Sequence, residues 1–159
     1  MTNCEKVNMD YANNIKTLNL ELPPPPKPAG SYQPVLESGF LAFLSGQISK
    51  TADGKIITGK VGSDLTAEEG KQAARTAALN VVSIIQNLIS FEKFDRILRI
   101  VGYVQTAPGF YDISQVMNGA SDLLIEIFGE KGIHARSAVG MASLPLNAAV
   151  EIEVTLLTL

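Results

Sequence analysis

Hydrophobic residues recur at helical spacing in two long stretches of the chain. Thr66 and Glu69 open the first stretch, residues 66–89, at the spacing of a capping box, which predicts a long amphipathic helix that lies on a sheet. Its apolar stripe consists of Ala73, Ala74, Ala77, Val81, Ile84, Ile85 and Leu88. A second stripe runs through residues 114–128 and stops at Gly129, which predicts a second helix with a glycine end.

Stretches rich in Val, Ile, Leu and aromatic residues, separated by turns, predict six strands. They cover residues 32–38, 40–49, 55–61, 94–107, 135–143 and 148–159. The last two are joined by Leu-Pro-Leu-Asn and would form a hairpin if they are direct neighbours. Helices and strands in this order predict an α+β fold with helices on one face of a mixed sheet.

The N-terminal region differs from the rest of the chain. Apolar residues at helical spacing predict a short helix over residues 3–18, with Asn3 as its N-cap. The segment LPPPPKPAG, residues 22–30, then fixes an extended path. We interpret it as a stiff connector, although its composition also suits a proline-rich ligand. We therefore expect a helix and connector over residues 1–27 and one α+β domain over residues 28–159.

Composition narrows the classes of function. The chain has 159 residues, of which 46% are hydrophobic and 18% charged, with a net charge of −3 and a pI of about 5.1. No cluster of lysine and arginine offers a basic surface, so we expect no nucleic-acid partner. No apolar run approaches the roughly 20 residues of a membrane span, and the start lacks a secretory pattern. We expect a cytoplasmic protein with no membrane partner.

Residues that carry metal or nucleophilic chemistry are few. Cys4 and His134 are the only cysteine and histidine, so the chain has no intrachain disulfide and no four-ligand structural zinc site of Cys and His. Neither a phosphate-binding glycine loop nor G-x-S-x-G occurs. We therefore expect no metal and no cofactor. His134 could be a general acid or base, but a lone histidine at a strand entry is more typical of a solvated surface.

The last two predicted strands place charges among small and apolar residues. Because side chains alternate along a strand, Arg136 shares a face with three small residues, and Glu151 and Glu153 lie opposite an apolar face. Surface ion pairing explains such charges most simply. The functional interpretation is that the Arg136 guanidinium binds a carboxylate with its fork of donors, while a glutamate orients or deprotonates a water.

Two geometric expectations follow from this pattern. In a simple hairpin, Arg136 lies opposite about Thr155, roughly 13 Å along the strand from Glu151. Substrate and water would have to span that gap, or else the two strands are not simple neighbours. We also expect the small-residue face beside Arg136 to be buried against another subunit, which predicts an oligomer. That face carries Ala138, Gly140 and Ala142.

Two motifs resemble the signatures of one protein family. The segment ARSAVGMASLPLNAAVEIEV, residues 135–154, resembles the C-terminal signature of the Rid family, also called the YjgF or L-PSP endoribonuclease-like family. The segment GSYQPVLESGFLAFLSGQIS, residues 30–49, resembles its N-terminal signature, in which Gly-Pro-Tyr precedes Ser-Gly-Gln-Ile. The resemblance covers roughly residues 28–157. Ser31 departs from it by replacing the proline, and Gln33-Pro34 replaces a small residue followed by Gln.

The resemblance implies a chorismate-mutase-like α+β subunit in a homotrimer with a central barrel and ligand clefts between subunits. It implies hydrolysis of 2-imino acids, such as 2-iminobutanoate and 2-iminopropanoate, to 2-keto acids and ammonia. By the same resemblance, Arg136 would bind the substrate carboxylate and Glu151 would position the attacking water. Tyr32 would close the pocket from a neighbouring subunit, and Asn118 would line it from the second helix.

Two alternatives to a deaminase remain. One is a non-catalytic regulatory trimer that binds a small carboxylate through Arg136. The other is a ribonuclease or translation inhibitor, against which the acidic pI and the lack of a histidine pair count.

Overall fold

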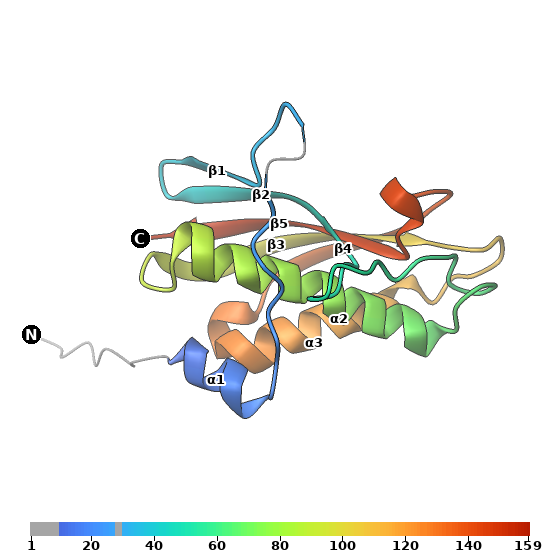
Figure 1. The fold of residues 1–159 in the computed structure, drawn as a ribbon, viewed down its shortest axis with the longest axis horizontal. Coiled ribbons are helices and arrows are strands. Elements are labelled where there is room, and N and C mark those ends of the chain that lie inside the picture. The colour runs from blue at the N-terminus through green and yellow to red at the C-terminus, as the bar shows by residue number, and fades with distance from the viewer. Residues whose placement is uncertain (1–9, 28–29) are drawn as a thin grey trace, which may run out of the picture.

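A five-stranded mixed sheet forms the centre of the computed structural model, which describes residues 10–27 and 30–159. The strands lie in the order β1-β2-β5-β3-β4 (Figure 1). β3 and β4 run parallel, and the other neighbouring pairs are antiparallel. The bounds are β1 Val35–Ser38, β2 Leu41–Ile48, β3 Phe94–Gln105, β4 Ala135–Met141 and β5 Val150–Thr158.

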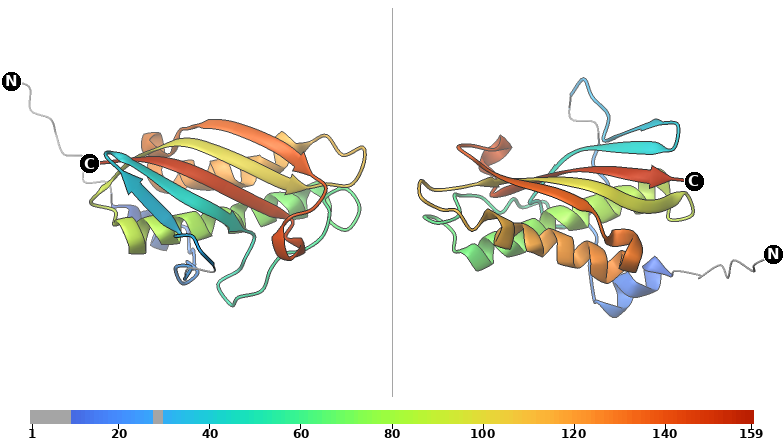
Figure 2. Two further views of the ribbon diagram at one scale, coloured as in Figure 1. Left: turned by 90° about the horizontal axis from the view of Figure 1, so that it is seen from above. Right: turned by 180° about the vertical axis from the view of Figure 1, so that it is seen from behind.

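Two long helices, α2 (Ala67–Ile84) and α3 (Ile113–Phe128), cover one face of this sheet (Figure 2). The capping box is confirmed, because the Thr66 hydroxyl accepts from the Glu69 amide while the Glu69 carboxylate accepts from the Thr66 amide. α2 continues as a π-helical turn, Ile85–Ile89, and α3 ends at Gly129. The expected α+β architecture is confirmed. Within residues 10–27 and 30–159, no helix is long and apolar enough to cross a membrane.

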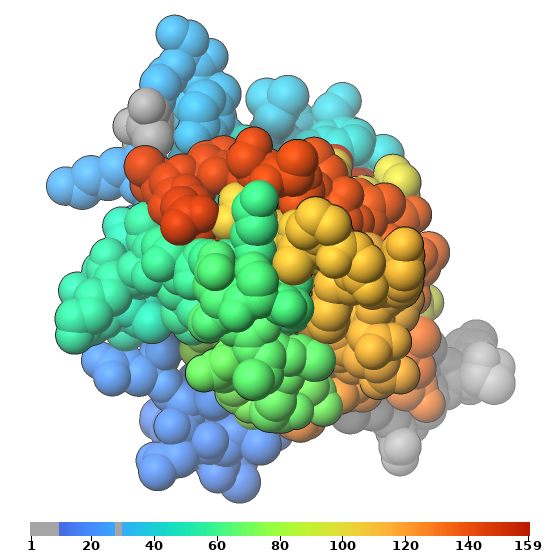
Figure 3. Space-filling model, turned by 90° about the vertical axis from the view of Figure 1, so that its right-hand side faces the viewer, coloured from blue at the N-terminus to red at the C-terminus, as the bar shows by residue number. Residues whose placement is uncertain are grey.

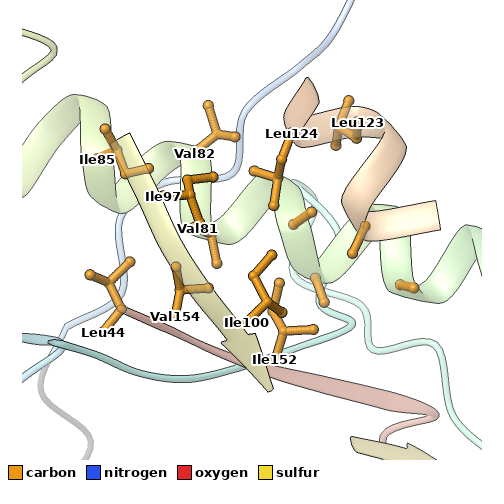
Figure 4. Packing of buried hydrophobic residues seen from close by; sticks show 14 of the residues in the cluster. Leu44, Val81, Val82, Ile85, Ile97, Ile100, Leu123, Leu124, Ile152 and Val154 are labelled. Atoms are coloured by element: carbon orange, nitrogen blue, oxygen red, sulfur yellow. The ribbon is translucent and has the colours of Figure 1, made fainter. Parts of the chain in front are cut away.

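The hydrophobic core lies between the sheet and these helices. β5 alternates as its sequence predicts, and its core-facing side chains are buried against α2 (Figure 4). Alanines on α2 let that helix approach the sheet closely, and burial of each large aliphatic side chain contributes about 1.5–3 kcal/mol. The main β5 and α2 members of this layer are Val150, Ile152, Val154, Leu156, Ala73, Ala74, Ala77 and Val81.

The last two strands do not form a hairpin. β4 pairs in parallel with β3, whereas β5 lies on the other side of β3, between β3 and β2. α3 makes the crossover that a parallel pair requires, so β3, α3 and β4 form one βαβ unit.

The predicted strand over residues 55–61 is not formed. That segment makes only isolated bridges, and Gly59 has a φ of 113°, outside the β region.

The N-terminal helix, α1 (Tyr11–Thr17), begins at Asp10, whose carboxylate accepts from the Asn13 amide at 2.9 Å. The earlier part of the predicted helix, with Asn3 as its cap, lies outside the described residues. Tyr11 joins a cluster of rings at centroid distances between 5.0 and 5.7 Å, which attaches α1 to the end of α3. Its partners are Phe91, Phe94 and Phe128.

The proline connector crosses α2 on its way to β1 (Figure 1). At the crossing, the buried Ser83 hydroxyl of α2 donates to the main-chain oxygen of Pro23 at 2.6 Å. This hydrogen bond fixes the connector on the helix, so the segment forms a strap over the domain before it reaches the sheet.

Candidate functional site

Arg136 projects from β4 toward α3, where three acceptors hold its guanidinium. Nη1 donates to Asn118 Oδ1 at 3.0 Å and to Ser121 Oγ at 2.9 Å, and Nη2 donates to the main-chain oxygen of Ser114 at 3.2 Å. An arginine has five N–H groups. Counting the partners within the described residues, the Nε hydrogen and one Nη2 hydrogen remain for a ligand.

The small residues on the Arg136 face have neighbours within the chain. Ala138 packs against the hydrophobic core, and a Cβ at Gly140 would meet Ile113 of α3 at 3.0 Å. Ala142 lies beyond the end of β4. The expectation that this face is buried against another subunit is therefore wrong, because β4 turns it toward the helix layer.

Ser121 connects Arg136 to His134, the residue directly before β4. His134 Nε2 lies 3.0 Å from Ser121 Oγ, and Nδ1 lies 2.6 Å from the main-chain oxygen of Gly132. Burial of the ring lowers the pKa of His134, and the charge of Arg136 lowers it further, while the hydrogen bond to Gly132 acts in the opposite direction. The interpretation of His134 as a solvated surface residue is therefore wrong.

Glu151 lies on the face of the sheet that the helices leave open. Its side chain is half-buried, and this burial, followed by the charge of Glu153, raises the pKa of the Glu151 carboxyl. Gly46 of β2 approaches so closely that a Cβ at residue 46 would overlap the carboxylate. Gly46 is thus needed for Glu151 to take this position. A carboxyl with a raised pKa is suited to accept a proton near neutral pH.

Glu151 and Tyr32 line one cavity of about 730 Å³. Its walls come from the proline connector, β2, the loop at residues 50–54 and the β4–β5 connection at Leu146. Figure 3 views the end of the molecule where the β4–β5 connection, in red, lies beside earlier segments in blue and green. The Ser45 hydroxyl donates to the main-chain oxygen of Gln33 at 2.7 Å, which ties the Tyr32 segment to β2.

One chain does not bring Arg136 and Glu151 together. Arg136 is in register with Ile100 of β3, and Glu151 is in register with Tyr103, on the opposite face. The two backbones are therefore two strand spacings apart, roughly 9–10 Å, and displaced by roughly 10 Å along the strands. The hairpin geometry is wrong, and the alternative, that the two strands are not neighbours, is the observed one.

The structure divides the predicted residues into two groups. Arg136 contacts Asn118, whereas Glu151 shares a cavity with Tyr32. Ser121 was not anticipated, although it lies three residues after Asn118, a spacing that places both on one helix face. Nothing local to the S-G-Q-I motif indicates the contact between Gly46 and a carboxylate. In the part of the chain that is described, no three His, Cys, Asp or Glu side chains gather as a metal site.

Comparisons with known proteins agree with this architecture. Residues 13–156 match the family model described as "YjgF/chorismate_mutase-like, putative endoribonuclease". The chain is 42% identical over 144 residues to Protein TCP17 of Trypanosoma cruzi, covering 89% of this chain and 90% of that protein. It is 27% identical over 135 residues to a 2-iminobutanoate/2-iminopropanoate deaminase of Dermatophagoides farinae, covering 84% and 91%.

A solved structure shares the whole fold. The protein Atu1372, of unknown function, from Agrobacterium tumefaciens superimposes with a TM-score of 0.85 at 35% identity, covering 93% of each chain. The matched residues span α1 to β5 and include both groups of candidate site residues. The chain therefore belongs to the YjgF/chorismate-mutase-like family.

Proposed function

We propose that this chain forms a homotrimer that hydrolyses 2-imino acids in clefts between subunits. The observation that carries the proposal is the division of the candidate residues. Among the described residues, two guanidinium hydrogens of Arg136 have no partner, and Glu151 lines a cavity on the other face of the sheet. A site that uses both residues needs Arg136 from one subunit and Glu151 from another.

The uncovered face of the sheet supports assembly. Leu36 and Phe43, in register across β1 and β2, are 63% and 45% exposed, and Val139 of β4 is 41% exposed on the same face. Exposed apolar side chains on a sheet face are typical of a subunit interface. This surface replaces the Ala138 face as the expected interface. A trimer has a mass of about 51 kDa, three times the 17.0 kDa of one chain.

The Arg136 group suits a carboxylate. Asn118, Ser121 and the Ser114 carbonyl take three of the five guanidinium hydrogens. Two donors that remain on one rigid, planar group match the two oxygens of a carboxylate. The side chain is held before ligand arrives, so binding loses less conformational entropy.

The Glu151 group suits activation of water. In the proposed reaction Glu151 takes a proton from water as the oxygen adds to C2 of the imino acid, which gives a carbinolamine. Glu151 then returns its proton to the nitrogen, and the C–N bond breaks with its electron pair on the departing ammonia. The C=O bond forms as the hydroxyl proton passes back to Glu151. One imino acid and one water give one 2-keto acid and one ammonia, with no change of oxidation state. Placement of the reactants supplies most of the catalysis, because an imine is already electrophilic.

The ribonuclease alternative has less support from the residues. His134 is the only histidine, and both of its ring nitrogens already have partners within the chain. One chain therefore cannot supply a pair of histidines for general acid and base catalysis. The net charge of −3 also lacks the excess of cations that binds a polyanion.

The test is the rate of 2-keto acid and ammonia release from 2-iminobutanoate generated in situ. Arg136→Ala and Glu151→Gln are each expected to lower kcat/KM by about 100-fold or more while the protein remains a trimer. Arg75→Ala and Glu126→Gln are matched controls, since they remove the two partners of an ion pair between α2 and α3. Wild-type protein without turnover that still binds 2-ketobutyrate through Arg136 would establish the non-catalytic receptor instead.

A further inference from the structure

A chain of hydrogen bonds runs from Arg136 into the protein and away from the proposed ligand. Arg136 Nη1 lies 2.9 Å from Ser121 Oγ, which lies 3.0 Å from His134 Nε2. On the far side of the ring, Nδ1 lies 2.6 Å from the Gly132 oxygen. His134 is part-buried behind Ser121 and does not line the cavity that contains Glu151.

The chemistry of the groups assigns each hydrogen in this chain. A guanidinium only donates, so Ser121 Oγ accepts from Arg136, and a carbonyl only accepts, so His134 Nδ1 carries a hydrogen for Gly132. In the neutral ring Nε2 then holds a lone pair, which accepts the Ser121 hydroxyl hydrogen. With these assignments, each donor in this series of hydrogen bonds has one acceptor.

A protonated ring breaks this assignment. Nε2–H would donate to Ser121 Oγ, which already accepts from Arg136, so both hydroxyl lone pairs would be used and the hydroxyl hydrogen would lose its acceptor. Burial and the Arg136 charge, which lower the pKa of His134, favour the neutral ring. Lys131, the charged residue three positions before His134, forms an ion pair with Asp95 of β3 and not with the histidine.

We propose that His134, as the neutral Nδ1–H tautomer, positions Arg136 through Ser121. The inference rests on the proposed function, because it specifies how the carboxylate-binding arginine is held. His134 directs the Ser121 lone pair at Nη1, which leaves the Nε hydrogen and the second Nη2 hydrogen for the ligand. His134 is a positioning residue, since it touches Arg136 only through the hydroxyl.

The first test needs no ligand and uses the single histidine of the chain. Nitrogen-15 NMR of histidine-labelled protein at pH 7.5 is expected to show protonated Nδ1 and unprotonated Nε2. Ser121→Ala should shift the Nε2 resonance, and Arg136→Ala should raise the pKa of His134 because it removes a positive charge. An Nε2–H tautomer, or a cationic ring at this pH, overturns the proposal.

The second test compares two replacements of His134. In His134→Gln the oxygen of the introduced side-chain amide can accept from Ser121, whereas His134→Leu fills similar space without an acceptor. We expect His134→Leu to weaken 2-ketobutyrate binding and raise KM by about 3–10-fold, with kcat nearly unchanged, and His134→Gln to stay within about 2-fold of wild type. Ser137→Ala, on the other face of β4, is the control.

The outcomes separate this inference from the proposed function. Equal losses in the leucine and glutamine variants overturn the positioning role, while Arg136-dependent binding in the wild type would still support the carboxylate site. If 2-ketobutyrate does not bind at all, the proposed function fails. In that case two measurements without ligand still test the positioning role. One is the tautomer of His134. The other is the Arg136 Nε–H resonance, which is expected to broaden in His134→Leu and not in His134→Gln.

Discussion

The residues around Arg136 and those around Glu151 differ in how many partners a single chain provides for the charged side chain. Arg136 has three partners on α3, and one of these, Ser121, leads on to His134 and Gly132. Glu151 instead lies half-buried beside another carboxylate, in a cavity of about 730 Å³. The first group is organised before any ligand or partner arrives, whereas the second holds a desolvated acid that lacks a counterion within its own chain among the described residues.

This difference suggests a division of labour between two copies of the chain. In the proposed function the rigid cation would select and orient a carboxylate, while the carboxyl of Glu151, with its raised pKa, would take up a proton. Each property would weaken the other within one chain, because a guanidinium next to Glu151 would lower the pKa of its carboxyl. In one chain the two groups lie on opposite faces of the sheet, so Arg136 does not lower the pKa of Glu151.

The largest expected effect comes from mixing two inactive variants. Arg136→Ala and Glu151→Gln trimers should each be nearly inactive. After unfolding and refolding as a 1:1 mixture, each mixed trimer contains one cleft with both native residues, so about a quarter of all clefts are intact. Recovery of about 25% of wild-type activity is therefore expected in the deaminase assay. The separately refolded variants are the control, and no recovery would mean that the cleft is not shared.

A smaller effect is expected from Gly46→Ala. The added methyl group would overlap the Glu151 carboxylate, so the carboxylate must move. We expect kcat to fall by about 10–100-fold, because a displaced base no longer reaches the water. The free energy of unfolding should also fall by about 1–3 kcal/mol.

The background variant Glu151→Ala tests the cause of that loss. Without the carboxylate, Gly46→Ala should cost much less stability, since the group that the methyl meets is gone. Equal destabilisation in both backgrounds, measured by chemical denaturation, would show that residue 46 must be glycine for a reason unrelated to Glu151.

Local pattern predicted the fold well where one segment decides its own structure. The capping box of α2, the glycine end of α3 and the alternation of β5 each depend on residues a few positions apart, and each is observed. The position of β4 could not be predicted in this way. Which strand pairs with β4 depends on the α3 crossover and on competition with β2 and β5 for β3, and no local signal in residues 135–143 encodes it.

The site residues show the same limit. The sequence placed Arg136, Ala138 and Gly140 on one side of a strand correctly, but strand alternation cannot say which side meets the helices. For that reason the Arg136 face was expected to meet another subunit and not α3, and the partner Ser121 was missed. His134 was misinterpreted because its burial depends on contact with Ser121 of α3, which the order of residues near His134 does not reveal.

The Arg136 group offers a test in which charge matters more than size. Asn118→Asp is nearly isosteric with the native residue but places a carboxylate against the guanidinium, 3.0 Å from Nη1 in the native contact. A resident anion offsets the charge that attracts the substrate, so KM should rise by about 10-fold or more. Asn118→Ala removes one of the hydrogen bonds that hold Arg136 and should raise KM by only about 3-fold.

Gln115→Ala is the control for both Asn118 variants, because Gln115 accepts from the Asn118 amide without touching Arg136. If the alanine variant proves worse than the aspartate variant in steady-state kinetics, then Asn118 acts on substrate directly and its contact with Arg136 is secondary.

The smallest expected effect concerns the stability of the ligand-free protein. Burial and Glu153 raise the pKa of the Glu151 carboxyl above its ordinary value, so the folded form binds this proton more tightly than the unfolded form. Stability is therefore lost as pH rises from the unfolded pKa through the folded one. Glu151→Gln should match wild type near pH 4 and exceed its Tm by about 1–3 °C at pH 7.5. A lower Tm for Glu151→Gln at pH 7.5 would mean that a cation from another subunit, such as a neighbouring Arg136, already faces the carboxylate, and the two groups would then be paired before substrate arrives.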